Sequence, residues 1–332
     1  MIKFGGNIVI RCDANEINGF GHLSRCINTA LGIRAKQNDC RIRFYGDYTD
    51  KAVSLIEKHG FEHILYNSHN HESSENLIKF IDNSSHFILD TYLITQNYID
   101  GLCNRNFRFI IFDDFFKFDL TRVNLVINYS IGADNHNYGA AHQALGLKYY
   151  PVKPALKIIR ETNIKAATRE YRSILVMIGS YDKYGIGSHI AEIIDSLVSG
   201  KTITYINAKN CTYFPKNNDL ISHAFYENIE NIYAKTDIAI TGGGLSKFEC
   251  AYCCIPVGVV AQNEGEFEET MTLDRNNLCR TVGRSYNFDD EAFTASFKNL
   301  LNPDTGRLLH SSSAKSFDSQ SLENLADKII NA

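Results

Sequence analysis

Short apolar segments alternate with stretches of helical periodicity along almost the whole chain, and this alternation limits the possible folds more than any other feature. Segments that are apolar throughout are typical of parallel strands, which are buried on both faces. Strands that alternate with amphipathic helices favour a parallel sheet covered by helices. The predicted strands cover residues 8–11, 41–45, 63–66, 87–90, 108–112 and 125–127, then 173–178, 203–206, 223–226, 237–241 and 257–260.

The alternation is interrupted once, around Pro151 and Pro154, and a charged stretch at 157–172 follows. Prolines and charges of this kind are typical of a passage between domains. We therefore predict an α/β protein with two Rossmann-like domains facing a cleft, covering residues 1–153 and 154–332. A final amphipathic helix at 319–331 could pack back on the first domain. Ligands of such folds bind beyond the carboxyl ends of the strands.

Composition excludes several functional classes. The chain has 332 residues and a net charge of -4, whereas nucleic-acid-binding proteins are usually basic. It shows no signal-peptide pattern and no apolar run long enough to cross a bilayer, so we expect a cytoplasmic protein without integral membrane contact. We expect a monomer or a weak homo-oligomer. The nine scattered cysteines are expected to be reduced thiols in the core.

The first candidate site is a glycine-rich turn, Gly19-Phe20-Gly21-His22, between a predicted strand and a helix that also carries Arg25. The first N–H groups of a helix lack intrahelical partners and attract anions. Gly19 and Gly21 would let the chain approach a substrate closely, and a histidine there can move a proton near neutral pH. The alternative is a plain strand–turn–helix connection with a surface histidine.

A second glycine-rich turn follows a later strand, at Thr241-Gly242-Gly243-Gly244. Its backbone N–H groups could approach a phosphate, which Ser246 could also bind. Glu249 lies one turn further on, where a carboxylate could accept hydrogen bonds from a ribose. The alternative is a tight turn with a solvated Glu249.

Other strand ends carry polar residues with two interpretations each. Asn263 could bind a sugar or cap a helix, and Tyr92 could hold a sugar ring or lie at the rim. Gly179 could close over a phosphate or belong to a polar turn. Asp113 and Asp114 could suggest a metal, but neighbours on a strand point to opposite faces, so we predict no metal site.

A Cys-x-x-Cys pair, Cys250 and Cys253, needs a separate interpretation. Such a pair can hold zinc, but no second pair with suitable spacing follows it. The surrounding run is apolar and is predicted to be helical. We therefore expect these thiols to pack in the core.

Short motifs follow one another in a defined order over roughly residues 7–285. They are Gly19-x-Gly21-His22-x-x-Arg25, Asp90-x-Tyr92, Asp113-Asp114, Gly146-x-x-Tyr149, Gly179-x-x-Asp182, the second glycine-rich turn with Glu249, and Asn263. Together they resemble the UDP-sugar hydrolase family of the pseudaminic acid pathway. That family is related to glycosyltransferases of the GT-B fold, including the enzyme that adds N-acetylglucosamine to the peptidoglycan lipid precursor.

The resemblance implies hydrolysis of a UDP-linked 2,4-diacetamido-2,4,6-trideoxy-altrose to UDP and free sugar, without a metal or cofactor. It implies that His22 is the general base and that sugar and nucleotide contacts come from different domains. The implied sugar contacts are Gly19, Gly21, Arg25, Tyr92 and Asn263. The implied UDP contacts are Gly179, Gly243, Gly244, Leu245, Ser246 and Glu249.

The chain departs from the family pattern at several of these places. Leu245 stands where the family usually has a hydroxyl residue, and Glu264 replaces a glutamine. Lys153 replaces an arginine, Ala155 an acidic residue, and Ser180 a glycine. The changes touch phosphate and sugar contacts but leave the base in place. The identity of the sugar and of the nucleotide therefore stays open.

The predicted reaction needs one base, because a nucleoside diphosphate is already a stable leaving group. His22 would activate water for attack on the anomeric carbon, through an oxocarbenium-like state, with inversion. N–H groups of the second turn would stabilise the departing charge. The alternatives are an inverting GT-B glycosyltransferase with a sugar or lipid acceptor, and a non-catalytic protein that binds nucleotide sugars.

Overall fold

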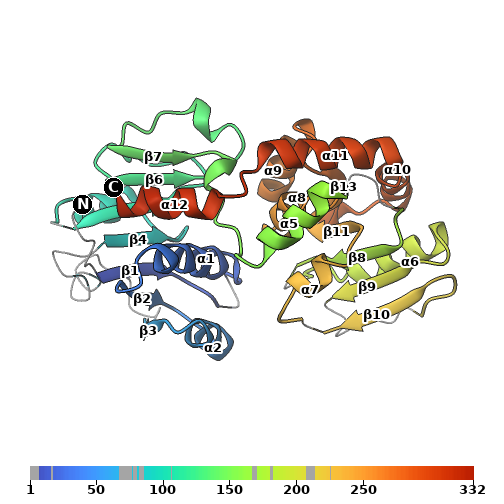
Figure 1. Ribbon diagram of the computed structural model, residues 1–332, viewed down its shortest axis with the longest axis horizontal. Coiled ribbons are helices and arrows are strands. Elements are labelled where there is room, and N and C mark those ends of the chain that lie inside the picture. Colours follow the sequence, from blue (N-terminus) through green and yellow to red (C-terminus); the bar gives the residue numbers. More distant parts are fainter. Residues whose placement is uncertain are drawn as a thin grey trace. The chain divides into compact units, whose positions relative to one another are not determined.

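The computed structural model describes residues 7–15, 18–66, 77, 81, 86–105, 107–166, 170–179, 182–206, 214–224 and 226–332. The chain forms two compact units, which Figure 1 shows in sequence colours. The first unit comprises Met1–Pro154 with Asp318–Ala332, and the second comprises Ala155–Phe317. Each unit is built on its own parallel sheet, so the α/β prediction is confirmed. The roles that the sequence suggests for the two domains remain predictions.

The first unit contains a seven-stranded sheet in the order β3-β2-β1-β4-β5-β6-β7, with every neighbouring pair parallel. Its central strands are apolar and buried along their length, as expected for a sheet covered on both faces. The strands are β1 (Asn7–Cys12), β2 (Arg41–Gly46), β3 (Glu62–Leu65), β4 (His86–Asp90), β5 (Arg108–Phe112), β6 (Leu125–Asn128) and β7 (His142–Leu145).

Helices connect these strands and supply the rest of the core. They are α1 (Gly21–Lys36), α2 (Asp50–Lys58), α4 (Gln96–Cys103) and, from the end of the chain, α12 (Ser321–Ile330). Helix α12 packs against α1: Lys36 pairs with Asp327 at 2.6 Å, and a Cβ on Gly32 would lie only 2.8 Å from a Leu322 side-chain carbon. The last helix therefore belongs to the first unit.

The second unit contains a six-stranded parallel sheet in the order β10-β9-β8-β11-β12-β13. Its strands are β8 (Ser173–Met177), β9 (Thr202–Ile206), β10 (Asp219–His223), β11 (Ile238–Gly242), β12 (Val257–Ala261) and β13 (Arg280–Arg284). Its helices are α5 (Leu156–Lys165), α6 (Gly187–Leu197), α7 (Glu230–Tyr233), α8 (Leu245–Tyr252), α9 (Glu264–Arg275), α10 (Asp290–Leu300) and α11 (Pro303–Ser316).

Most differences from the sequence prediction lie at sheet edges. Strand β10 precedes the strand predicted at 223–226, and residue 225 lies outside the described residues. Strands β7 and β13 are polar and were not predicted, because an edge strand needs no continuous apolar run. Among the described residues, every helix is too short or too polar to cross a lipid bilayer.

Candidate functional site

The first glycine-rich turn lies between β1 and α1, at the carboxyl edge of the first sheet. Gly19 has a positive φ of 65°, which favours glycine, and α1 begins at Gly21. Within the part of the chain that the structure describes, a Cβ on either glycine would meet no atom within 4 Å. His22 therefore lies in the first turn of α1, where no acidic residue and no capping side chain occupies the helix N-terminus.

His22 forms a close pair with Asp90, the last residue of β4. The imidazole Nδ1 lies 2.6 Å from Asp90 Oδ1, and the Asp90 side chain is fully buried. Strand β4 is hydrogen-bonded to β1, with Asp90 opposite Cys12, the residue that ends β1. Because parallel strands end at the same edge, the two residues meet although 68 positions separate them.

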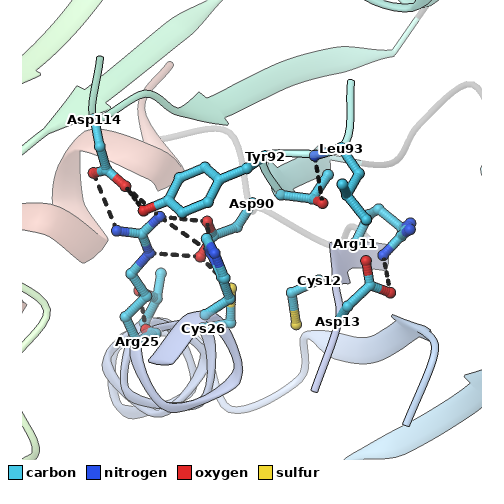
Figure 2. Close-up of polar contacts among 12 residues, drawn as sticks. Arg11, Cys12, Asp13, Arg25, Cys26, Asp90, Tyr92, Leu93 and Asp114 are labelled. Atoms are coloured by element: carbon cyan, nitrogen blue, oxygen red, sulfur yellow. Dashed lines mark hydrogen bonds and ion pairs between the residues drawn. The ribbon is translucent and has the colours of Figure 1, made fainter. Parts of the chain in front are cut away.

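Arg25, one turn after His22, holds the carboxylates in place (Figure 2). Its Nε and Nη2 donate to the two oxygens of Asp90, at 2.6 and 2.5 Å. Its Nη1 and Nη2 donate to Asp114 at 3.1 and 2.9 Å, and Nη1 also donates to the Tyr129 hydroxyl at 2.9 Å. All five N–H groups of the guanidinium thus have partners within the first unit.

The charges of this cluster stabilise one another. Burial alone would raise the pKa of Asp90, but the neighbouring Arg25 and His22 hold it well below its usual range. Burial would lower the pKa of Arg25, but Asp114 and Asp90 raise it above its ordinary value. Asp90 is therefore a carboxylate and Arg25 a cation near neutral pH.

This arrangement suits His22 for proton transfer. A carboxylate bound to one ring nitrogen fixes the tautomer and stabilises the imidazolium that forms when the other nitrogen takes a proton. Both contacts described for His22, to Asp90 and to Arg25, involve Nδ1. Nε2 is thus the nitrogen that would accept a proton from a substrate.

Tyr92 closes the cluster from the loop after β4. Its hydroxyl donates to Asp114 at 2.7 Å, and its ring meets the His22 ring edge to face, with centroids 4.4 Å apart. Desolvation and the Asp114 carboxylate raise the pKa of Tyr92, so the phenol stays protonated and donates.

The two adjacent carboxylates after β5 have separate partners. Asp114 accepts hydrogen bonds from Arg25, whereas Asp113 accepts them from the Tyr138 hydroxyl and the Phe116 amide, each at 2.8 Å. Within the described ranges, no three His, Cys, Asp or Glu side chains are arranged to hold a metal ion.

The second glycine-rich turn follows β11 and is shaped by packing. A Cβ on Gly242 would lie 2.4 Å from the Ile178 carbonyl oxygen, and one on Gly243 would collide with Glu266. A Cβ on Gly244 would meet no atom of the described residues within 4 Å. The backbone at Ile178 therefore requires the first glycine and the Glu266 side chain favours the second, while the third lies against open space.

The buried Lys247 side chain binds the backbone of this turn. Its Nζ donates to the Gly243 carbonyl and lies 2.7 Å from Glu269 Oε2. The lysine fixes the direction of the Gly243 peptide and so of the amides that follow. Lys247 carries no signal of this role in the sequence, because a lysine in an amphipathic helix is usually solvated.

The predicted nucleotide contacts Leu245, Ser246 and Glu249 all lie on α8, which starts directly after the turn. The N-terminus of α8 has no side-chain cap and no acidic residue in its first turn. Glu249 is partly buried and accepts a hydrogen bond from the Tyr233 hydroxyl at 2.8 Å. The carboxylate is thus oriented rather than freely solvated.

Gly179 and Asn263 lie at neighbouring strand ends of the second sheet. Gly179 lies just after β8 and has a positive φ of 110°. Gln262, which follows β12, donates to the carbonyl oxygen of the preceding residue, Ile178, at 2.8 Å. Asn263 caps α9, accepting from the Glu266 amide at 2.9 Å. The structure thus shows the capping role, and a sugar contact by Asn263 stays a prediction.

Glu264 does not present an isolated negative charge. The Tyr286 hydroxyl donates to it at 2.6 Å, and Arg284 lies 4.0 Å away.

The Cys250 and Cys253 thiols are buried and form no disulfide, and burial raises the pKa of both.

The structure brings His22, Arg25 and Tyr92 together, and adds partners that the sequence did not assign. Asp90 and Asp114 belong to the ordered motifs of the sequence but had no catalytic role assigned to them, and no motif includes Tyr129. Their position after apolar strands was the available signal, because such ends meet at one edge. The predicted contacts Gly179, Gly243, Gly244, Leu245, Ser246, Glu249 and Asn263 lie in the second unit.

The chain matches no protein-family model. An uncharacterized protein of Methanocaldococcus jannaschii is 24% identical over 282 residues, which are 77% of this chain and 56% of that relative. This chain thus spans little more than half the length of the curated relative it matches.

Solved structures of similar fold include glycosyltransferases. MurG of Acinetobacter baumannii superposes with a TM-score of 0.71 and 11% identity, over 98% of this chain and 100% of MurG. A UDP-glucose:anthocyanidin 3-O-glucosyltransferase bound to UDP gives 0.67 and 9%, over all of both chains. UGT89C1 of Arabidopsis thaliana bound to UDP-L-rhamnose gives 0.64 and 11%, over 98% and 99%. The chain has the α/β fold of GT-B glycosyltransferases.

Proposed function

We propose that this protein is an enzyme that transfers the glycosyl group of a nucleotide sugar to an acceptor hydroxyl, with His22 as the general base. The observation that carries the proposal is the 2.6 Å contact between His22 Nδ1 and the buried Asp90 carboxylate. A histidine oriented in this way is suited to deprotonating a hydroxyl. The fold supports the proposal, since it is shared with glycosyltransferases that are named for UDP-sugar donors or were solved with UDP.

In the proposed step, His22 Nε2 takes the proton of the acceptor hydroxyl. The acceptor oxygen bonds to the anomeric carbon as the bond from that carbon to the diphosphate breaks. The electron pair of that bond leaves with the nucleoside diphosphate, and the anomeric configuration inverts. Because one base serves a single displacement, no covalent sugar–enzyme intermediate is required.

The remaining predicted residues divide by role. Arg25 is assigned as a positioning residue, because its five N–H groups already bind Asp90, Asp114 and Tyr129. The sugar contacts are assigned to Gly19, Gly21 and Asn263, whereas Tyr92, whose ring lies against His22, is assigned to the acceptor. The nucleotide, which we propose is UDP, is assigned to Gly179, Gly243, Gly244, Leu245, Ser246 and Glu249.

The amides at the start of α8 are the proposed contacts of the diphosphate. The N-terminus of α8 has no side-chain cap, and Gly244 leaves open space beside it. Lys247 holds the turn in place through the Gly243 carbonyl. Backbone amides held in this way stabilise a departing anion without reorganising.

Hydrolysis is the second candidate, with water as the acceptor. The order of motifs from Gly19 to Asn263 favours it, because it resembles the UDP-sugar hydrolases of the pseudaminic acid pathway. The substrate would then be UDP-2,4-diacetamido-2,4,6-trideoxy-altrose or a close analogue. The same base and the same nucleotide contacts would serve both reactions.

The test is nucleotide release from a panel of UDP-sugars, measured with and without added acceptor alcohols. Transfer predicts release that rises with acceptor and a glycosylated product, whereas hydrolysis predicts steady release in water alone. His22→Ala should abolish either reaction while the protein still binds UDP. Near-wild-type turnover by His22→Ala would refute the assignment of the base, and UDP binding without turnover of any donor would indicate a binding protein.

A further inference from the structure

Four large apolar side chains are exposed together beside the candidate base. Tyr92 is 54% exposed, Leu93 69%, Phe115 49% and Phe116 39%. They follow β4 and β5, neighbouring strands that end at the edge where His22 lies. We name these four residues the apolar shelf. Single exposed apolar residues are common, but a contiguous exposed group marks an interaction site.

The shelf begins at the base itself. The Tyr92 ring lies 4.4 Å from the His22 ring, and the Phe115 ring lies 4.9 Å from Tyr92, measured between centroids. A molecule lying on Tyr92 and Phe115 would therefore be next to the imidazole. The shelf belongs wholly to the first unit.

The loop that presents Phe115 is held in an unusual backbone conformation. Phe116 has a φ of 55°, in the left-handed region that bulky residues rarely adopt. Its amide donates to Asp113, and its ring packs against His136 and Tyr138, with centroids 4.1 and 5.0 Å away. These contacts fix the loop, and the neighbouring Phe115 stays exposed. Fixed, strained loops of this kind cluster at functional sites.

The chemistry of the shelf selects among acceptors. Of its four side chains only Tyr92 has a polar group, and its hydroxyl already donates to Asp114. A polyol placed here would meet the Lys117 amine, 4.6 Å from the Phe115 ring centroid, but its other hydroxyl groups would lose water over apolar side chains. An apolar ring would lose little and would gain contact with two aromatic rings and Leu93.

We infer that the acceptor of the proposed reaction is a hydroxylated compound with an apolar ring, whose ring packs on the shelf while its hydroxyl faces His22. This inference rests on the proposed function and specifies its substrate class. The acceptor proton passes to His22 Nε2, the acceptor oxygen bonds to the anomeric carbon, and the nucleoside diphosphate leaves with the electron pair of the broken bond.

Binding of 2-naphthol, followed by saturation-transfer NMR without any donor, tests the shelf directly, with glycerol as the polar comparison. Leu93→Ser and Phe115→Ser should each weaken 2-naphthol binding about tenfold, or about 1.4 kcal/mol. Leu65→Ser is the matched control, because Leu65 is 61% exposed at the end of β3. Equal weakening by all three variants, or equal binding of glycerol, would overturn the inference.

Turnover separates the inference from the proposed function. With a UDP-sugar that the protein uses, both shelf variants should raise the KM for 2-naphthol about tenfold and change kcat little. Nucleotide release that needs His22 but is not stimulated by 2-naphthol would overturn the shelf as an acceptor site and leave the proposed function standing. Binding of 2-naphthol to the shelf without turnover of any donor would overturn the proposed function, and the acceptor role with it.

Discussion

Replacing Asp90 by asparagine should nearly abolish catalysis, for a reason that the hydrogen bonds define. The two Asp90 oxygens accept from His22, twice from Arg25, and from the Cys26 thiol at 3.3 Å. An asparagine has one oxygen, so its amide nitrogen must replace one of the two acceptors. Facing His22, that nitrogen would donate to Nδ1 and force the proton onto Nε2, which could then no longer act as a base. Facing Arg25 Nε, it would set two donors against each other.

The size of both effects can be worked out. Losing the correct tautomer in a comparable dyad lowers kcat by roughly ten-thousandfold. Weakening a buried charge pair costs about 3–5 kcal/mol of unfolding free energy, which corresponds to a Tm lower by roughly 10 °C for a unit of this size. Nucleotide release measured well below the Tm separates the two effects, and UDP binding should persist.

Asp114→Asn is the matched control for Asp90→Asn. Asp114 also binds Arg25, through two hydrogen bonds, but it does not contact His22 Nδ1. It should therefore lower the Tm while losing much less rate. If folded Asp90→Asn kept a kcat within about tenfold of wild type, or if both variants lost rate equally, the pairing of His22 with Asp90 would not be what prepares the base for catalysis.

Three further predictions concern the glycines of the second turn and a buried histidine. Gly242→Ala should lower stability by about 1–3 kcal/mol in calorimetry, because its Cβ would meet a carbonyl oxygen at 2.4 Å. Gly244→Ala should leave the Tm unchanged yet weaken UDP binding measured by titration, because its Cβ would enter the open space assigned to the diphosphate; unchanged binding would contradict that assignment. Burial, together with Arg108, lowers the pKa of His86 to about 4, whereas an unfolded histidine titrates near ~6.5. Neutral His86 therefore contributes fully to the free energy of unfolding above the unfolded pKa of ~6.5. This contribution is lost as the pH falls toward the folded pKa of about 4. Urea unfolding should therefore show up to about 3 kcal/mol of loss over this window, and His86→Phe should flatten it.

The sequence predicted those parts of the fold that depend on local pattern. Central strands such as 108–112 are apolar throughout, and α1 has both a glycine start and helical periodicity. The charged stretch after Pro154 was instead interpreted as a linker, whereas it forms α5. Arg160 of α5 is 2% exposed and donates to the Tyr252, Ala314 and Phe317 carbonyls. A charge buried by distant carbonyls leaves no signal in its own segment.

In the candidate site, too, contacts set by local sequence were predictable, and contacts set by strand order were not. His22 and Arg25 share a helix turn, so their spacing predicts that they are neighbours. Asp90 joins them only because β4 pairs with β1, although β2 and β3 come between them in the chain. That strand order is a tertiary property. The dyad therefore had to be found in the structure, although each of its members was visible as a polar residue at a strand or helix end.

The hydrogen bonds also connect the apolar shelf to the base. Tyr92 donates to Asp114, Asp114 accepts from Arg25, and Arg25 donates to Asp90, which orients His22. The links from Asp114 to His22 are buried or partly buried, where hydrogen bonds polarise one another and an unmatched group is costly, whereas the Tyr92 link is exposed. A shift of Tyr92 by an acceptor would therefore disturb a network that is otherwise saturated. Binding that leaves the Tyr92 hydroxyl in place keeps the base oriented, so the network favours acceptors that pack on the ring face over those that compete for the hydroxyl. The hydrogen-bond network that orients His22 as a base thus also favours an apolar acceptor.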